Sequence, residues 1–174
     1  DARLAAMDAQ GVHVHALSLS QPMNYWAGRS VGEKLAAVFN EDLALAHEKS
    51  PKRLVGLAAL PLHGPDLAVK EVRWARANGL ASIMLPVIWG THAPYHHPCY
   101  RPLWEVCQEL RVTVHFHSGP ADSEQYFGSW PPDPGAPTLR GAMGIYVSEV
   151  AWFVARPLTF LIWGGVFEDH PALR

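Results

Sequence analysis

The sequence predicts an α/β fold in which parallel strands alternate with helices. Three observations indicate this class: short apolar stretches recur along the chain, a helical pattern follows nearly every one of them, and glycine or proline marks many of the boundaries. A chain of 174 residues with 49% hydrophobic and 17% charged residues is the size of one domain. We therefore expect βα units and a parallel sheet that is either open or closed.

The chain begins with one such unit. Residues 2–9 have the pattern of the end of a helix, and Gly11 is the stop expected just past a helix terminus. Residues 12–20 read as a strand, and residues 31–48 read as an amphipathic helix. Four apolar residues of that helix fall on or near one stripe: Leu35, Val38, Phe39 and Leu45. We expect this stripe to pack on the sheet.

The alternation continues through the middle of the chain. Two further strands are expected at residues 54–60 and 81–87, and each precedes a helical pattern, at residues 66–78 and 99–110. Cys107 lies inside the second of these helices, and with Cys99 it is expected to be a reduced, packed thiol because the spacing is too wide for a CxxC pair. A fourth strand, residues 112–117, follows.

The last third of the chain is different in composition. Residues 118–137 are rich in proline, glycine and aspartate, and we interpret them as a long loop on the side of the active site. A helix is expected from residue 138 to about residue 154, and Pro157 can start another at its first turn, which continues over residues 158–168. The chain begins without methionine inside a helical pattern, so we expect a piece of a longer protein and a single, incomplete domain over residues 1–174.

Charge and hydropathy disfavour several classes of partner. The formal net charge is -2 and no cluster of lysine and arginine is present, so we expect no nucleic-acid or anionic-membrane binding. No apolar run reaches the roughly 18 residues of a membrane span, and no signal segment opens the chain. A cytoplasmic protein that acts on a small molecule is the expectation that remains.

Histidines provide the candidate chemistry. His117 ends the strand at residues 112–117, where Ser118 and Gly119 begin a loop, and ligands of parallel α/β folds bind at that end of the strands. A neutral imidazole there can bind a divalent metal, while His115 lies one layer deeper on the same face, as support or packing. On general grounds, a lone histidine at a strand end is more often a structural residue than a ligand.

A second pair of histidines has a more motif-like spacing. His13 and His15 share one face of the strand at residues 12–20, as adjacent metal ligands do. Five strand residues follow His15, which places the pair about 16 Å from the carboxyl end at 3.3 Å per residue. We therefore expect His13 and His15 to pack near the amino end of the sheet rather than to bind metal.

Histidines and aromatic residues also gather in the expected loops. His92, His96 and His97 lie at the same end as His117, where solvated loop residues are the simpler interpretation. The substrate-pocket candidates are His115 and four loop residues: Trp26, Trp89, Tyr126 and Phe127. Loop aromatic residues favour a planar or aromatic acid as substrate, although such residues more often only pack.

Several segments together resemble the amidohydrolase-related family that includes aminocarboxymuconate semialdehyde decarboxylase and other nonoxidative decarboxylases. The resemblance covers almost the whole chain. The matching pieces, in order, are residues 7–12 and 17–18, Asn40, residues 51–56 and 59–61, residues 100–105 and 109–110, and residues 164–171. Their order and spacing carry the resemblance more than any single piece does.

The resemblance implies a partial (β/α)8 TIM barrel, with roughly strands 2 to 5 and their helices but without the first and last strands. It also implies one divalent metal, usually zinc, held by a His-x-His pair on the first strand, a middle-strand histidine and a late aspartate. His117 matches the middle-strand histidine, whereas His13 and His15 fall in the second-strand segment. This chain therefore supplies one ligand of an incomplete site, and no catalytic acid or base is identified.

Three alternative functions are compatible with these residues. Zinc activates water and polarises carboxylates, so the same site suits loss of carbon dioxide from a small carboxylic acid, which we favour, or hydrolysis of an amide, lactone or ester. The third alternative is an inactive fragment or scaffold, because half a barrel leaves strand edges uncovered. The family resemblance further implies homodimers.

Overall fold

The computed structural model describes residues 2–19, 23–87, 92–118 and 138–174. Strands and helices alternate through these residues as the sequence predicted. The elements are α1 (Ala2–Ala9), β1 (His15–Ser18), α2 (Arg29–Lys49), β2 (Leu54–Ala59), α3 (Pro65–Ala77), β3 (Ser82–Pro86), η1 (Pro98–Tyr100), α4 (Arg101–Glu109), β4 (Thr113–His117), α6 (Thr138–Trp163) and α7 (Val166–Asp169).

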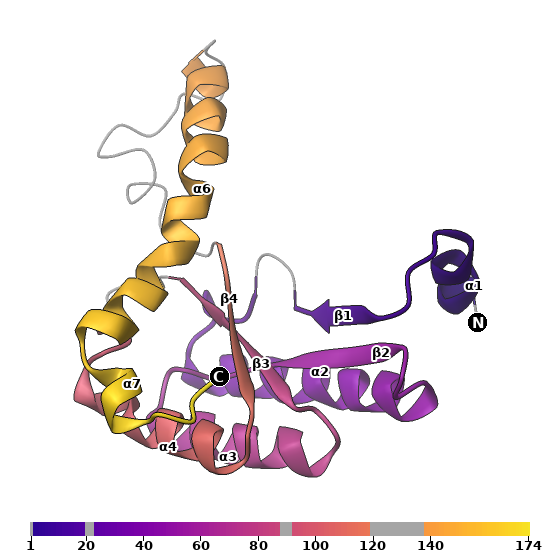
Figure 1. Ribbon diagram of the computed structural model, residues 1–174, viewed down its shortest axis with the longest axis horizontal. Coiled ribbons are helices and arrows are strands. Elements are labelled where there is room, and N and C mark those ends of the chain that lie inside the picture. The colour runs from indigo at the N-terminus through magenta and orange to yellow at the C-terminus, as the bar shows by residue number, and fades with distance from the viewer. Residues whose placement is uncertain (1, 20–22, 88–91, 119–137) are drawn as a thin grey trace.

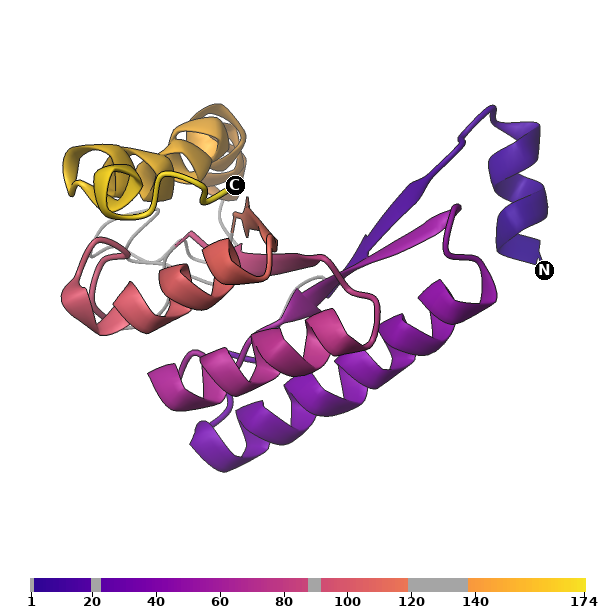
Figure 2. The ribbon, with the colours of Figure 1, turned by 60° about the horizontal axis from the view of Figure 1, so that its bottom comes forward.

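The four strands form one parallel sheet in the order β1-β2-β3-β4. Each strand pairs with the next one along the chain, and a helix makes every crossover between them. Helices α2, α3 and α4 lie on the same side of the sheet, as Figures 1 and 2 show. The expected α/β class and the parallel sheet are therefore confirmed.

The register of the sheet separates its two faces, because paired residues of neighbouring parallel strands direct their side chains to the same face. Gly56 faces the helices, since a Cβ placed on it would lie 3.1 Å from the Cβ of Leu43 in α2. Ala58 is two residues further along β2, and it pairs with Ile83, which pairs with Val114. Ala58 and Ile83 are fully buried. The core therefore lies between the sheet and these helices.

Asn40 joins α2 to the carboxyl end of β2. Its side-chain Nδ2 donates to the carbonyl oxygen of Ala59 at 2.8 Å and to Oε1 of Glu71 in α3 at 2.7 Å. The backbone N–H of Ala59 donates to Oδ1 of Asn40 at 2.8 Å. Asn40 is fully buried, so its amide loses its hydrogen bonds to water on folding. These protein hydrogen bonds replace the lost ones. One amide thus fixes the end of a strand and two helices.

The prediction that the apolar stripe of α2 packs on the sheet is wrong for three of its four residues. Leu35, Val38 and Leu45 remain 39%, 66% and 53% exposed, and only Phe39 packs against the core. The buried residues of the helix are instead Gly32, Ala36, Asn40 and Leu43. Small side chains let α2 approach the sheet closely, and the Asn40 hydrogen bonds satisfy a polar residue there. Hydrophobicity alone therefore selected the wrong face.

The helix break expected at Pro157 is also absent. α6 runs through Pro157 as one helix, although proline has no N–H for a helical hydrogen bond. The ribbon of α6 bends along its length, and its amino-terminal half projects beyond the carboxyl end of β4 (Figure 1). Such a bend is the usual response to an internal proline. The chain then ends α6 at Trp163 and turns at Gly165, which has a positive φ of 73°.

Candidate functional site

His117 is the last residue of β4 and pairs with Pro86, the last residue of β3. It faces away from α2, α3 and α4, because Val114 faces them and successive side chains alternate. The carbonyl oxygen of His117 accepts from the N–H of Val87 at 3.2 Å, which extends the pairing beyond the end of β3. The imidazole therefore lies at the carboxyl end of the sheet, on its face opposite the core.

A hydrogen bond selects the tautomer of His117. Nδ1 lies 2.6 Å from the carbonyl oxygen of Ser118. A carbonyl oxygen only accepts, so in the neutral ring Nδ1 carries the proton and Nε2 keeps its lone pair. Metal-bound histidines in proteins commonly have this arrangement, in which one nitrogen donates to an oxygen and the other binds the ion. The half-buried side chain of His117 therefore fits the requirement for a metal ligand.

His115 lies one layer below His117 on the same face of the sheet. It pairs with Met84 and is half-buried. Burial lowers the pKa of the His115 imidazole, because the surroundings solvate the charged form poorly. The structure thus places beneath His117 a ring that favours its neutral form.

A buried aromatic cluster supports the ends of β3 and β4. The phenol of Tyr95 donates to the carbonyl oxygen of Pro86 at 2.5 Å. Its ring centroid lies 5.2 Å from that of Phe116, and its own carbonyl oxygen accepts from Nε1 of Trp104 at 3.1 Å. Burial holds the pKa of Tyr95 well above its usual value, so the phenol remains a donor. Tyr95 thereby fixes the strand end that pairs with His117.

A second ring cluster lies beyond the carboxyl ends of β2 and β3. The ring centroids of Tyr25 and His63 are 6.5 Å apart, and those of His63 and His92 are 6.4 Å apart at nearly right angles. Desolvation and, to a smaller extent, the nearby His63 lower the pKa of His92. Nδ2 of Asn24 donates to the carbonyl oxygen of Leu60 at 3.3 Å, which ties the segment before α2 to the end of β2.

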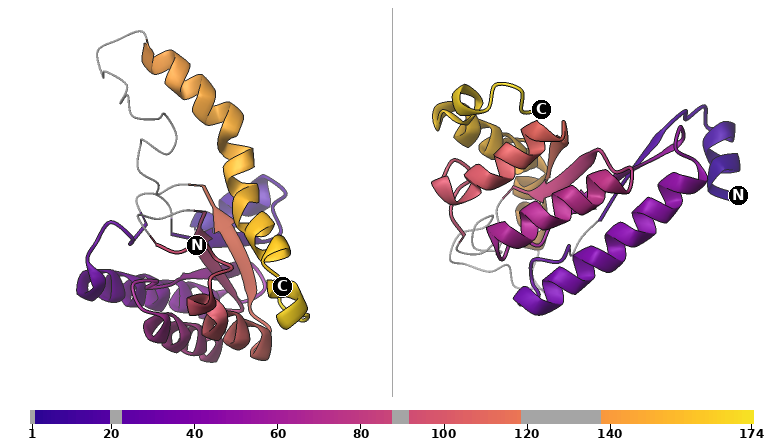
Figure 3. Two further views of the ribbon diagram at one scale, coloured as in Figure 1. Left: turned by 90° about the vertical axis from the view of Figure 1, so that its left-hand side faces the viewer. Right: turned by 90° about the horizontal axis from the view of Figure 1, so that it is seen from below.

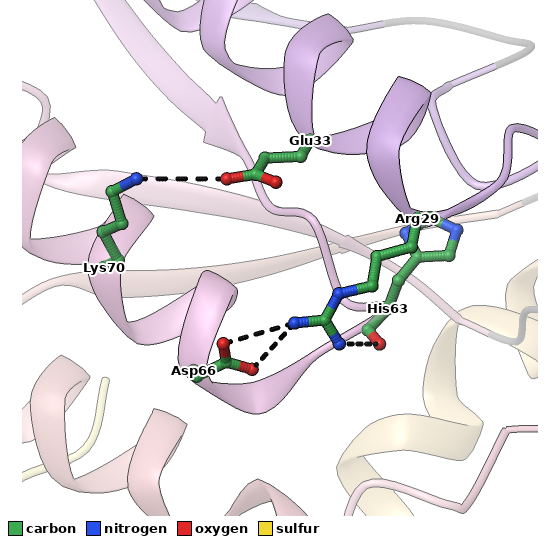
Figure 4. A network of polar contacts seen from close by, with 5 residues as sticks. All are labelled: Arg29, Glu33, His63, Asp66 and Lys70. Carbon is green, nitrogen blue, oxygen red and sulfur yellow. Dashed lines mark hydrogen bonds and ion pairs between the residues drawn. The ribbon is translucent and has the colours of Figure 1, made fainter.

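Exposed ion pairs connect the amino-terminal turns of α2 and α3 near this cluster (Figure 4). The guanidinium of Arg29 donates to both carboxylate oxygens of Asp66, at 3.4 and 3.3 Å, and to the carbonyl oxygen of His63 at 3.4 Å. Glu33 and Lys70 form a looser pair at 3.9 Å. Solvent screens such contacts, so they orient the loops more than they stabilise the fold.

His13 and His15 lie away from the candidate site. β1 is shorter than expected and begins at His15, which pairs with Leu54 at the start of β2. His15 also lies on the helix-facing side, because Leu54 is two residues before Gly56 on that face. The expected position at the amino end of the sheet is confirmed for His15, whereas His13 precedes β1 and is exposed rather than packed. The register places His15 and His117 on opposite faces.

The other substrate-pocket candidates are only partly placed. Trp26 is 67% exposed, whereas the adjacent Tyr25 is buried. Trp89, Tyr126 and Phe127 lie outside the described residues, as does all of the 118–137 loop except Ser118. Within the described ranges, no three His, Cys, Asp or Glu side chains come together to hold a metal ion. His117 is therefore a single ligand candidate there.

Sequence reasoning missed Tyr95 and His63 as parts of this region. Tyr95 lies in the segment between β3 and η1, and His63 lies in the turn between β2 and α3. His63 lies four residues after the end of β2 and Tyr95 lies nine residues after the end of β3, so a place in the segment that follows a strand is the available signal. None of the described helices is long and apolar enough to cross a membrane.

A known decarboxylase matches this chain over its whole length. The chain is 31% identical to gamma-resorcylate decarboxylase of Rhizobium sp. (strain MTP-10005) over 184 residues; this covers all of the chain and 53% of that protein. The chain therefore spans about half the length of this relative.

Solved structures of other proteins share the fold of this chain. A putative amidohydrolase from Staphylococcus aureus superposes with a TM-score of 0.83 at 22% identity, covering the whole chain and 57% of that protein. Dihydroxybenzoic acid decarboxylase from Polaromonas sp. JS666, which has bound manganese and the inhibitor 2-nitroresorcinol, gives a TM-score of 0.72 at 26% identity, covering the whole chain and 52% of that protein. The four strands are thus part of a (β/α)8 barrel, and His117 faces its interior.

The family assignment covers the complete sequence. Residues 1–174 match the Amidohydrolase family from end to end. The resemblance drawn from the separate sequence segments is confirmed by this match and by the decarboxylase relative. The chain therefore belongs to the amidohydrolase family.

Proposed function

We propose that the whole protein is a metal-dependent decarboxylase of a small aromatic carboxylic acid. The observation that carries this proposal is the position of His117 at the carboxyl end of β4. The hydrogen bond between Nδ1 and the Ser118 carbonyl oxygen leaves Nε2 with its lone pair. The identity with a gamma-resorcylate decarboxylase favours loss of carbon dioxide over hydrolysis.

His117 would hold one divalent ion together with ligands from outside the described residues. Bound manganese in the Polaromonas decarboxylase supports a divalent ion, and it makes manganese as good a candidate as the zinc expected from the sequence. When bound, such an ion polarises a carboxylate or phenol oxygen and stabilises negative charge on it. His117 contributes a neutral, oriented donor, and the Ser118 carbonyl keeps its second nitrogen protonated.

The surroundings of His117 suit a planar acid. His115 lies below it and favours the neutral form, so it offers a hydrogen bond without adding a fixed charge. We assign the substrate pocket to His115, Trp26, Trp89, Tyr126 and Phe127. Aromatic side chains pack on a planar ring and exclude water from a reacting carboxylate, which favours release of neutral carbon dioxide.

Carbon dioxide release from gamma-resorcylate tests this proposal. The whole protein is stripped with a chelator, reloaded separately with Mn²⁺ or Zn²⁺, and assayed beside its His117→Ala variant. We expect release only with metal, and a loss of at least about a hundredfold in the variant. A lactone and an anilide serve as hydrolase substrates. If the protein hydrolyses these substrates in a metal-dependent way and releases no carbon dioxide from aromatic acids, it is a hydrolase rather than a decarboxylase. Activity that does not depend on metal would contradict both the decarboxylase and the hydrolase assignment.

A further inference from the structure

Helix α6 has a pocket on its surface. The pocket has a volume of about 370 Å³ and is lined by Trp152, Phe153, Ala155, Arg156 and Thr159. This volume lies at the lower end of the range for small-molecule sites in proteins, which is about 300–1,000 Å³. A small organic molecule is therefore the kind of ligand that fits this pocket.

The pocket opens away from the core. At about 100° per residue, Trp152, Arg156 and Thr159 fall within about 60° of one another around α6. The buried positions of this part of the helix are centred about 130° away from them: Phe153, Pro157 and Leu161. In the left view of Figure 3, α6, drawn orange to yellow, runs along the edge of the molecule with β4 on its inner side. The three pocket residues therefore face outward.

A different side of α6 carries an exposed apolar stripe. Val154, Leu158 and Ile162 are 37%, 49% and 54% exposed, and they lie about 130° around the helix from the pocket residues. The chain spans about half the length of the decarboxylase that it matches, so the remaining part of the barrel packs against this half. An apolar stripe has the composition of such a contact. Packing on the stripe leaves the pocket, on the other side, open.

Arg156 supplies the charge of the pocket. Its guanidinium carbon lies 5.4 Å from the centroid of the Phe153 ring, which is a cation–π contact. Such a contact uses the flat face of the guanidinium and leaves the N–H groups at its edge available. Among the residues that the structure describes, no ion pair involves Arg156. The guanidinium is thus held in place and can pair with a bound anion.

The other lining residues indicate the chemistry of that anion. Trp152 is 75% exposed and offers a large ring face beside Arg156. The hydroxyl of Thr159 donates to the carbonyl oxygen of Ala155 at 3.0 Å, so its proton is already used within the helix. Arg156 is the one cationic side chain in the lining, which matches a single carboxylate better than a phosphate. An aromatic ring with one carboxylate complements both features.

We propose that this pocket binds an aromatic monocarboxylate, with the carboxylate paired to Arg156 and the ring against Trp152. The site is separate from the inner face of β4 that carries His117. Its occupancy requires neither the metal nor the reaction proposed above. For a ligand of this size in an open pocket, we expect a dissociation constant near about 1 mM.

Fluorine NMR of 4-fluorobenzoate titrated into the metal-free whole protein tests this site. Wild type should broaden the fluorine signal saturably, and Arg156→Gln should raise the dissociation constant at least about tenfold, because the charge-assisted hydrogen bonds are lost. Arg111→Gln is the matched control, at an exposed arginine outside the pocket, and should leave the dissociation constant unchanged. Equal binding by wild type and Arg156→Gln would overturn the proposal.

Two further ligands separate the roles of the charge and the ring. 4-Fluorobenzamide keeps the ring without the charge, and fluoroacetate keeps the charge without the ring. Each should bind at least about fivefold more weakly than 4-fluorobenzoate, and Trp152→Ala should weaken binding of 4-fluorobenzoate by a similar factor. If either simpler ligand binds as well as 4-fluorobenzoate, the pocket does not recognise an aromatic carboxylate.

The His117→Ala variant distinguishes this site from the barrel interior. The variant should bind 4-fluorobenzoate with the wild-type dissociation constant, because Arg156 and Trp152 are unchanged. Loss of binding in His117→Ala would place the acid inside the barrel and refute the proposal. The result does not depend on whether the protein proves to be a decarboxylase or a hydrolase.

Discussion

His15 and His117 lie on opposite faces of the same four-stranded sheet. His15 pairs with Leu54 on the face that packs against the helices, and His117 pairs with Pro86 on the face inside the barrel. The two residues also occupy opposite ends, because His15 begins β1 and His117 ends β4. The His-x-His spacing at His13 and His15 is therefore unrelated to the candidate metal site.

Substitution of these histidines should separate their roles. In the whole protein, His117→Ala should lower the affinity for Mn²⁺ or Zn²⁺ by at least about tenfold, because a directly coordinating nitrogen is lost. The double variant His13→Ala/His15→Ala should bind metal as wild type does. Isothermal titration of the metal into the metal-free proteins measures the affinity of both variants. Equal losses of affinity in the two variants would refute the assignment of the metal to the face of the sheet that carries His117.

Tyr95→Phe should weaken metal binding without unfolding the protein. The variant keeps the ring against Phe116 but loses the hydrogen bond to the Pro86 carbonyl, so the strand end beside His117 is less fixed. We expect about a threefold to tenfold higher metal dissociation constant and a loss of about 1 kcal/mol in stability. Tyr100→Phe removes a phenol from the same cluster and serves as the control. Unchanged affinity in Tyr95→Phe would show that this bond does not position His117.

Asn40→Ala should cost about 3 kcal/mol of unfolding free energy. The substitution leaves the N–H and the carbonyl of Ala59 without their side-chain partner in a buried position. Asn78→Ala, at an exposed asparagine at the end of α3, should change stability by less than about 0.5 kcal/mol. Urea denaturation measures both variants, and a similar small effect at both positions would contradict the role given to Asn40.

Glu71 should make stability depend on pH. Burial raises the pKa of its carboxyl group in the folded protein, although the Asn40 hydrogen bond opposes the shift. The favourable contribution is therefore present below the unfolded pKa of about 4.3 and is lost as the pH rises through the folded value. Glu71→Gln keeps the acceptor for Asn40, so it should be more stable than wild type at pH 7 and equal to it at pH 4. Denaturation curves of both proteins at both pH values test this prediction. A stability difference between Glu71→Gln and wild type that is larger at pH 4 than at pH 7 would contradict it.

The sequence predicted the order of elements because local patterns determine them. The strand at residues 112–117 and its end at His117 were located from alternation followed by Ser118 and Gly119, and the structure has β4 at Thr113–His117. β1 is shorter than the expected 12–20, since among residues 12–19, which the structure describes, only His15–Ser18 pair with β2. Strand length depends on the neighbour, which the pattern of one strand does not contain.

The burial of α2 shows where sequence reasoning fails. Leu35 and Val38 looked like core residues, but Gly32 and Ala36 pack on the sheet because their small size allows close contact, and Asn40 is buried because Ala59 and Glu71 satisfy its amide. The same limit applies to the site. His117 was identified from its place on a strand, whereas the support from Tyr95 depends on a fold-dependent contact with Pro86.

The central claim is that Nε2 of His117 binds the metal inside the barrel. Anomalous diffraction from crystals of the whole protein, recorded at the absorption edge of the bound metal, tests this most directly. We predict one peak about 2.0 to 2.3 Å from His117 Nε2, with Nδ1 still hydrogen-bonded to the Ser118 carbonyl. A metal peak elsewhere in the protein, with none at His117, would contradict the account.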